Sequence, residues 1–340
     1  MKTKILFGLA FNGLCMLCFG WLLLNSTLSL YLLKMGQGQL NLILHTQKIE
    51  DILKDGKLSK EEKEKLLWVE KIKQYSVDSL GYKPTKNFTT YFNQNNQPIL
   101  WVVTACKPFK FEAYMWEFPL LGKVSYKGFF NKNLAQQEYL KLLRAGYDAD
   151  LSTVSAWSTL GWLSDPVLSS MLKRPKSRLA NLLFHELFHA TYYASGTVDI
   201  NENLANFVAF KATNKFLQND TTELNRYLQS TQDDSLYNRF IFSGYEKLNA
   251  FYEKTQNANT LYLLKEKQKM LNKIYFESTR LKLNNSKRYE NANKEILITK
   301  NAFFMDARRY DGLYDSLNRV LEDKYKGNLK NMISDLKNKN

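Results

Sequence analysis

The first feature of the hydrophobic pattern is a long apolar run near the N-terminus. No charged residue occurs between Ile5 and Leu33, and the segment from Ile5 to Leu24 has about the length that a helix needs to cross a bilayer. Lysines precede this run, so the positive-inside tendency predicts a cytoplasmic N-terminus and an extracytoplasmic remainder, on the periplasmic side of a bacterial inner membrane. We therefore expect residues 1–34 to form a membrane anchor, with a cleaved signal peptide and a lipoprotein signal as alternatives.

Beyond this run, residues 35–160 show a mixed pattern of helices and strands. Ser59 followed by Glu62 has the spacing of a capping box and opens an amphipathic helix that ends near Gly81. Short β-rich runs then alternate with Asn, Pro and Gly, which predicts strands of an antiparallel sheet. The expected elements are strands at 99–105, 124–130 and 150–157 and a helix at 134–143.

From Ser177 onward the pattern becomes almost wholly helical. Apolar residues recur at helical spacing over 204–217, through residue 283 and again over 313–336. The predicted fold class is therefore α+β, with an N-terminal transmembrane helix, a small antiparallel-sheet region and a helical domain that carries the candidate active-site helix. Within the domain 35–340, we assign residues 161–340 to the mainly helical part.

Composition narrows the classes of function. The 340 residues carry a formal net charge of +15, but no basic and aromatic recognition motif accompanies it, so nucleic acid is not an expected partner. Solvated lysine-rich helix faces explain this charge, and weak attraction to anionic lipid is the other interpretation. Cys106 is the only cysteine beyond the apolar run, which excludes an intramolecular disulfide there and indicates a buried thiol.

The strongest chemical signal is the segment Leu182–His189, which reads LLFHELFH. His185 and His189 are one helical turn apart and can present two imidazoles to one zinc ion, while Glu186 can take a proton from a zinc-activated water. This His-Glu-x-x-His pattern is the zincin signature of metallopeptidases. A chance match is the alternative, but two of the chain's three histidines fall in the pattern, and their apolar neighbours predict burial.

A catalytic zinc usually has three protein ligands, so a third ligand is expected. The remaining histidine, His45, lies far away in the sequence, which favours a carboxylate from the segment after the motif. We predict Glu202, just before a second helix that begins near Leu204. Helix capping by Glu202 together with Asp199 is the alternative, and Asp199 is also a reserve ligand or a partner that orients a histidine.

Several separated motifs resemble the bacterial family of predicted aminopeptidases, a zincin-type group whose second helix contains Asn-Glu. Besides His185 to His189, the matching residues are Trp116 to Pro119, Tyr126 to Phe130, Ser158 to Trp162, Asp165 with Pro166, Asn201 with Glu202, and Asn301 with Ala302 and Tyr310. The resemblance covers most of the chain beyond the apolar run. It implies a gluzincin-like peptidase in which His185, His189 and Glu202 bind one zinc ion and Glu186 is the general base.

Amide hydrolysis also needs a hydrogen-bond donor for the developing oxyanion, and a tyrosine hydroxyl suits this role. Tyr193, Tyr126 and Tyr310 are the candidates, with packing as the alternative for each. The aromatic segments 114–130 and 157–162 are candidate substrate contacts or core. We expect zinc-dependent hydrolysis of peptides; the alternatives are a non-catalytic scaffold of the same fold at the membrane and a lipid-binding membrane-surface module.

Overall fold

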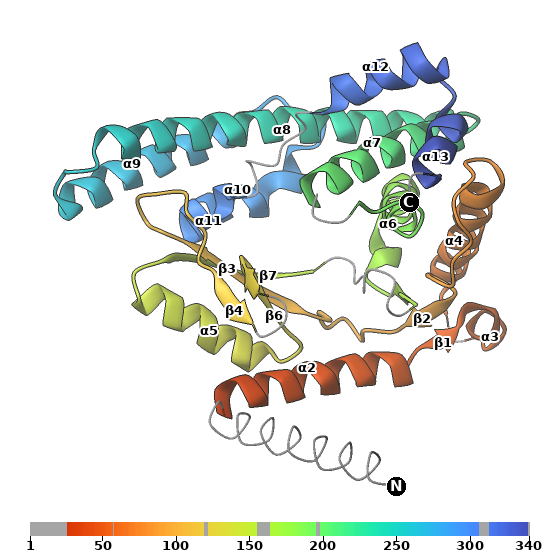
Figure 1. Cartoon of the computed structure of the whole chain (residues 1–340), viewed down its shortest axis with the longest axis horizontal. Helices are drawn as coiled ribbons and strands as arrows, with labels where there is room; N and C mark the ends of the chain where they lie inside the picture. The colour runs from red at the N-terminus through yellow and green to blue at the C-terminus, as the bar shows by residue number, and fades with distance from the viewer. Residues whose placement is uncertain are drawn as a thin grey trace, which may run out of the picture.

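The computed structural model describes most of the chain, namely residues 26–56, 58–118, 122–154, 164–194, 198–305 and 313–338 of the 340. Its first elements are α2 (Ser26–Leu44), β1 (Gln47–Lys48), α3 (Ile49–Lys54) and α4 (Lys60–Asp78). Strand β2 (Thr90–Phe92) pairs antiparallel with β1 and parallel with β8 (Val167–Leu168). Helix α2 runs along one side of the molecule beneath the sheet region, and α4 stands at the edge nearest α6 (Figure 1).

The prediction of an N-terminal transmembrane helix is corrected by the structure. Across the described residues, no helix is both long enough and apolar enough to cross a membrane. Helix α2, the first described helix, packs against the sheet region at the end of β6. The Tyr31 ring lies 5.3 Å from that of Phe129, and the backbone at Gly38 approaches Phe130 so closely that a Cβ there would come within 2.1 Å of its ring. The run Ile5–Leu24, on which the prediction depended, lies outside the described residues. The predicted membrane-anchored location is contradicted by the same finding.

The helix predicted after Ser59 is confirmed as α4. The Glu62 amide donates to Ser59 Oγ at 3.2 Å, and the Ser59 amide donates back to the Glu62 carboxylate at 2.9 Å, so the capping box is complete. The chain turns after this helix at Gly81, whose φ of +76° suits glycine. The apolar face of α4 is buried and lies against α6.

The predicted antiparallel sheet is also confirmed. Its central strand β3 (Trp101–Cys106) pairs with β6 (Tyr126–Phe129) on one side and β7 (Asp148–Thr153) on the other, and Val103 faces both Lys127 and Leu151 across the ladders. Helix α5 (Lys132–Arg144) packs against this sheet. A separate hairpin is formed by β4 (Trp116–Phe118) and β5 (Gly122–Val124).

Several aromatic residues of the segment 114–130 belong to the core of the sheet region. Trp116 is 6% exposed and donates its indole N–H to Glu138 at 2.9 Å, and the Tyr114 ring packs on it at 4.8 Å. Phe129 is buried in the same cluster, and Cys106 is buried nearby as a free thiol. Packing is therefore the role of these aromatics, whereas segment 157–162 lies outside the described residues.

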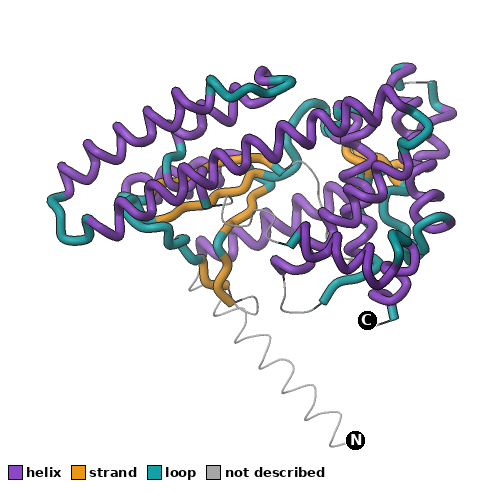
Figure 2. Tube along the Cα trace, turned by 90° about the horizontal axis from the view of Figure 1, so that it is seen from above, coloured by secondary structure: helices purple, strands orange, loops and turns teal. Residues whose placement is uncertain are grey.

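The second half is helical, as predicted. Its helices are α6 (Lys176–His189), α7 (Val198–Phe216), α8 (Thr221–Lys254), α9 (Thr260–Ser278), α10 (Glu290–Ile298), α11 (Asn301–Phe304), α12 (Tyr314–Tyr325) and α13 (Leu329–Lys337), with short 3-10 turns at Met171–Lys173 and Ser286–Tyr289. The long helix α8 crosses the molecule and packs against α9 along one face (Figures 1 and 2). The proposed boundary between residues 35–160 and 161–340 stays a prediction.

Helix α6 lies at the centre of the largest core. It packs against α4 on one side and α7 on the other, and Figure 1 shows it almost end-on between them. Its apolar face is almost completely buried, through Leu179, Ala180, Leu183, Phe184, Leu187 and Phe188. This burial fixes the rotation of α6 about its axis, and so decides where its polar residues lie.

A second buried feature joins the sheet to the C-terminal helices. Lys267 on α9 forms an ion pair with Asp148 on β7 and also donates to the Pro108 carbonyl at 2.7 Å. The Asn301 amide donates to Asp148 at 3.1 Å, and the Tyr252 hydroxyl donates to the Asn301 side chain at 2.8 Å. We refer to Asp148, Lys267, Asn301 and Tyr252 as the Lys267 cluster.

Candidate metal centre

The two histidines of α6 converge on one point beside its buried face. Their side chains are only 16% and 9% exposed for His185 and His189, respectively. The rings meet edge to face with centroids 4.7 Å apart, and the two Nε2 atoms are 3.1 Å apart. This is the geometry expected of residues one helical turn apart, as the sequence predicts.

Helix α7 brings Glu202 opposite the two imidazoles. One carboxylate oxygen lies 3.3 Å from His185 Nε2 and the other lies 3.3 Å from His189 Nε2. In the part of the chain that the structure describes, these three residues form the group whose donor atoms could together hold a metal ion. His45, the third histidine, is exposed at the end of α2 and takes no part in it.

The predicted start of the second helix near Leu204 is wrong, because α7 begins at Val198 and Glu202 lies within it. Segment 198–203 is rich in β-branched residues and asparagine, whose helix propensities are modest, so the sequence alone favours a loop. Extensive packing of α7 against α6 outweighs that local preference. As a result, Glu202 is held on a helix rather than on a flexible connection.

Asn201 connects the end of the histidine helix to the helix of Glu202. Its side-chain oxygen accepts from the Ala194 amide at 2.9 Å, and its side-chain nitrogen donates to the Ala194 carbonyl at 2.7 Å. Only 1% of Asn201 is exposed, so both hydrogen bonds are shielded from water. This pair of bonds fixes the backbone just before Glu202 relative to the backbone just after His189.

Electrostatics keep Glu202 ionised. Hydrogen bonds from His185 and His189 lower the pKa of Glu202 far below its usual range. Burial alone lowers the pKa of His185, but its hydrogen bond to Glu202 and the nearby carboxylates outweigh burial and raise that pKa. Burial raises the pKa of Glu186, and the adjacent histidines oppose this shift. The centre therefore combines the Glu202 carboxylate, whose ionised form the histidines favour, with two imidazoles and the Glu186 carboxyl, whose protonated form is favoured by burial.

The separations between the donor atoms fit a small tetrahedral ion. Zinc sits about 2.0–2.2 Å from imidazole nitrogen and carboxylate oxygen, so neighbouring ligand atoms around it lie about 3.3 Å apart. The observed separations are 3.1 Å between the nitrogens and 3.3 Å from each nitrogen to a carboxylate oxygen. Two imidazoles and one carboxylate are also the donor set of known catalytic zinc sites.

Of the other predicted site residues that the structure describes, one lies beside the metal centre and two are exposed. Tyr193 is half-buried beside the centre, with its ring 5.9 Å from that of His189. Tyr126 is 57% exposed on β6, and Asp199 is exposed in the first turn of α7, outside the group of three donors. Tyr310 lies outside the described residues.

Two asparagines near the centre were not anticipated from the sequence. The Asn206 side chain is near enough to His185 to help raise the pKa of that imidazole. Asn181 donates to the Tyr227 hydroxyl at 2.9 Å. Asn181 precedes His185 by four residues and Asn206 follows Glu202 by four, so helical periodicity places each one turn from a candidate ligand. This four-residue spacing is the sequence feature from which the two asparagines could have been predicted to lie near the metal centre.

Comparison with known proteins identifies the family to which the chain belongs. A family model described as "Putative aminopeptidase" matches residues 30–338. No curated protein and no solved structure matches the chain. The match covers both the sheet region and the helices that carry His185, His189 and Glu202. The chain therefore belongs to this aminopeptidase family, as its separated motifs predicted.

Proposed function

We propose that the protein is a zinc-dependent peptidase that hydrolyses peptide bonds at the centre formed by His185, His189 and Glu202. Membership of an aminopeptidase family supports peptide hydrolysis as the activity. The observation that carries the metal assignment is the convergence of two imidazole nitrogens and a carboxylate within 4.8 Å of one another. Two imidazoles and one carboxylate favour zinc over magnesium or calcium, which prefer oxygen ligands.

Different side chains of the protein would bind the ion, transfer the proton and stabilise the oxyanion. His185, His189 and Glu202 would bind the ion, and a bound zinc would supply a Lewis acid and lower the pKa of water to about 7. Glu186 would accept the proton of the attacking water and return it to the departing amine, and burial, which raises the pKa of its carboxyl, makes it a better proton acceptor than an exposed glutamate. Tyr193, next to His189, is our candidate donor to the oxyanion, and Tyr310 remains a prediction for the same role.

The direct test is the metal content of the full-length protein after gel filtration. We expect one zinc ion per chain in the wild type and in Glu246→Ala, an exposed carboxylate change on α8, and much less in Glu202→Ala. No metal in freshly prepared wild type would contradict the proposal.

A second comparison separates metal binding from catalysis. Glu186→Gln should retain the ion, because Glu186 is not among the three donors, but should lose about 100- to 10,000-fold in kcat on a peptide substrate. Cleavage at the wild-type rate by this variant would reject Glu186 as the base. An intact biological role without cleavage would instead favour a scaffold protein.

A further inference from the structure

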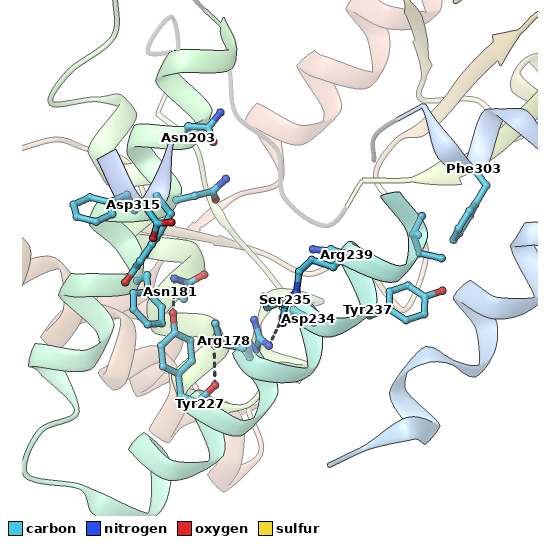
Figure 3. A pocket seen from close by; sticks show the side chains of 17 residues that line it. Arg178, Asn181, Asn203, Tyr227, Asp234, Ser235, Tyr237, Arg239, Phe303 and Asp315 are labelled. Carbon is cyan, nitrogen blue, oxygen red and sulfur yellow. Dashed lines mark hydrogen bonds and ion pairs between the residues drawn. The ribbon is translucent and has the colours of Figure 1, made fainter. Parts of the chain in front are cut away.

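A cavity of about 810 Å³ lies beside the metal centre, at the meeting of α6, α7, α8, α11 and α12. Figure 3 shows Asn181 and Tyr227 toward one side of this cavity and Tyr237 and Phe303 toward the other, with Ser235 and Arg239 between them. The volume is in the range of natural ligand sites, about 300–1,000 Å³. We call this cavity the α8 groove.

The α8 groove begins one helical turn from the metal ligands. Asn181 on α6 and Asn206 on α7 both line it, and they stand four residues from His185 and Glu202, respectively. A molecule lying in the groove would therefore extend away from the site at which His185 and Glu202 would hold the ion.

The length of the α8 groove is set by helix α8. Its lining residues on this helix run from Tyr227 to Ile241, over which an α-helix rises by about 21 Å. An extended polypeptide covers about 3.3 Å per residue, so this distance corresponds to about six residues. A single amino acid or a dipeptide would occupy only the end next to the metal centre.

The chemistry of the lining matches a polypeptide main chain. Among the described residues, its charged side chains are those of Arg178, Arg239, Asp234 and Asp315, so this lining is formally neutral although the whole chain carries +15. Arg178 and Asp234 further neutralise each other in an ion pair. The part of the lining that the structure describes thus carries no excess charge that would select an anionic ligand such as a nucleotide or a phospholipid headgroup.

Amide and aromatic side chains make up much of the remaining lining. Asn181, Asn203, Asn206 and Asn238 each offer a donor and an acceptor, as a peptide group does. Six aromatic residues from α7, α8, α11 and α12 provide apolar surface between them: Phe207, Phe210, Tyr227, Tyr237, Phe303 and Tyr314. A polypeptide presents the same combination of polar main chain and apolar side chains.

We propose that the α8 groove binds about six residues of an extended, uncharged or mixed-charge oligopeptide, so that the substrate is an oligopeptide rather than a dipeptide or tripeptide. This inference rests on the proposed peptidase function for its biological meaning. What it predicts directly is peptide binding, and binding can be measured separately from hydrolysis.

The experiment measures binding of fluorescently labelled alanine/leucine/phenylalanine peptides of two, four, six and eight residues to zinc-loaded Glu186→Gln protein by fluorescence polarisation. Affinity should rise at least about tenfold from two to six residues and level off at eight. Asn238 lies about 16 Å along α8 from Tyr227, so Asn238→Ala should weaken six-residue binding by about 3- to 10-fold and leave two-residue binding unchanged. Asn225→Ala, an exposed asparagine on α8 outside the groove lining, is the matched control and should have no effect.

The outcomes are separable. Affinity that does not change with peptide length, or equal effects of Asn238→Ala and Asn225→Ala, would overturn the groove assignment even if the wild type cleaves peptides. Asn238→Trp adds bulk at the same position and should remove the gain between four and six residues. If binding depends on length as expected but the wild type hydrolyses none of these peptides, the groove stands and the proposed peptidase function fails.

Discussion

The Lys267 cluster and the metal centre are two polar groups of similar size that are built in opposite ways. The ion pair of the first and the two histidines of the second are largely buried, whereas the Glu202 side chain is 47% exposed. In the Lys267 cluster the ammonium and carboxylate neutralise each other, and their side chains are 3% and 7% exposed. In the metal centre two imidazole nitrogens face each other at 3.1 Å, and His189 Nδ1 is buried with no hydrogen-bond partner among the described residues. Burial of charge therefore does not by itself mark a functional site; convergence of donor atoms does.

The physical reason lies in how each group is satisfied. A buried charge is tolerated when an opposite charge and hydrogen bonds surround it, and such a group needs nothing further. Imidazole nitrogens that converge with a carboxylate gain most from a cation placed between them. The first arrangement joins elements of the fold, whereas the second is suited to bind an ion.

The largest expected effect comes from breaking the Lys267 cluster. Lys267→Met removes the ammonium and leaves Asp148 buried without its counter-charge, which should lower the free energy of unfolding by about 3–5 kcal/mol. Urea denaturation measures this change. The exposed Lys269→Met, which removes only a surface pair with Glu266, should cost less than about 1 kcal/mol. Equal losses of unfolding free energy in the two variants would show that the buried ion pair stabilises the fold no more than a surface pair does.

Metal binding should stabilise the fold through the other group. At free zinc about 100-fold above Kd, the wild type should gain about 2.7 kcal/mol in unfolding free energy. His189→Ala removes a donor and should lose this gain, whereas Lys267→Met should keep it if it still folds, because its cluster is separate from the three donors. Urea midpoints with and without zinc provide the measurement. A zinc effect that survives in His189→Ala would place the ion elsewhere.

Asn201 should affect the metal centre without contributing a ligand. Asn201→Ala removes both hydrogen bonds to Ala194, so the backbone before Glu202 is no longer fixed to the backbone after His189. We expect zinc affinity to fall by about 10- to 100-fold, the usual range for residues that support a ligand. Competition with a chromogenic chelator measures this affinity. Asn219→Ala, at an exposed position after α7, is the control. Equal zinc affinities in the two variants would show that Asn201 does not support the metal centre.

The smallest expected effect is at Cys106. Burial raises the pKa of this thiol to about 12, so at pH 8 almost no reactive thiolate is present. The native protein should leave Cys106 unlabelled by iodoacetamide over a time in which the urea-unfolded chain reacts fully. Peptide mass mapping distinguishes Cys106 from the cysteines near the N-terminus. Rapid labelling of the native protein would show that the interior around the Lys267 cluster opens readily.

Part of the fold could be predicted because local patterns and tertiary packing agree there. The capping box of Ser59 and Glu62, the alternating strand around Val103 and the apolar periodicity of α6 each specify an element that the structure confirms. The predicted transmembrane helix is contradicted because no described helix is both long and apolar enough to cross a membrane. The predicted start of α7 was wrong because packing against α6 makes segment 198–203 helical despite its modest local helix propensity.

The sequence by itself determined that two histidines lie one turn apart with a glutamate beside the first, since helical spacing and residue chemistry are local properties. It also determined the family, through motifs spread over most of the chain. Only the tertiary structure decided that Glu202 meets both imidazoles and that Asn201 fixes its approach. It alone also decided that the α8 groove is lined by Asn181 and Asn206, one helical turn from His185 and Glu202. These relations depend on how α6, α7 and α8 pack, and packing between helices is set by contacts among residues distant in sequence.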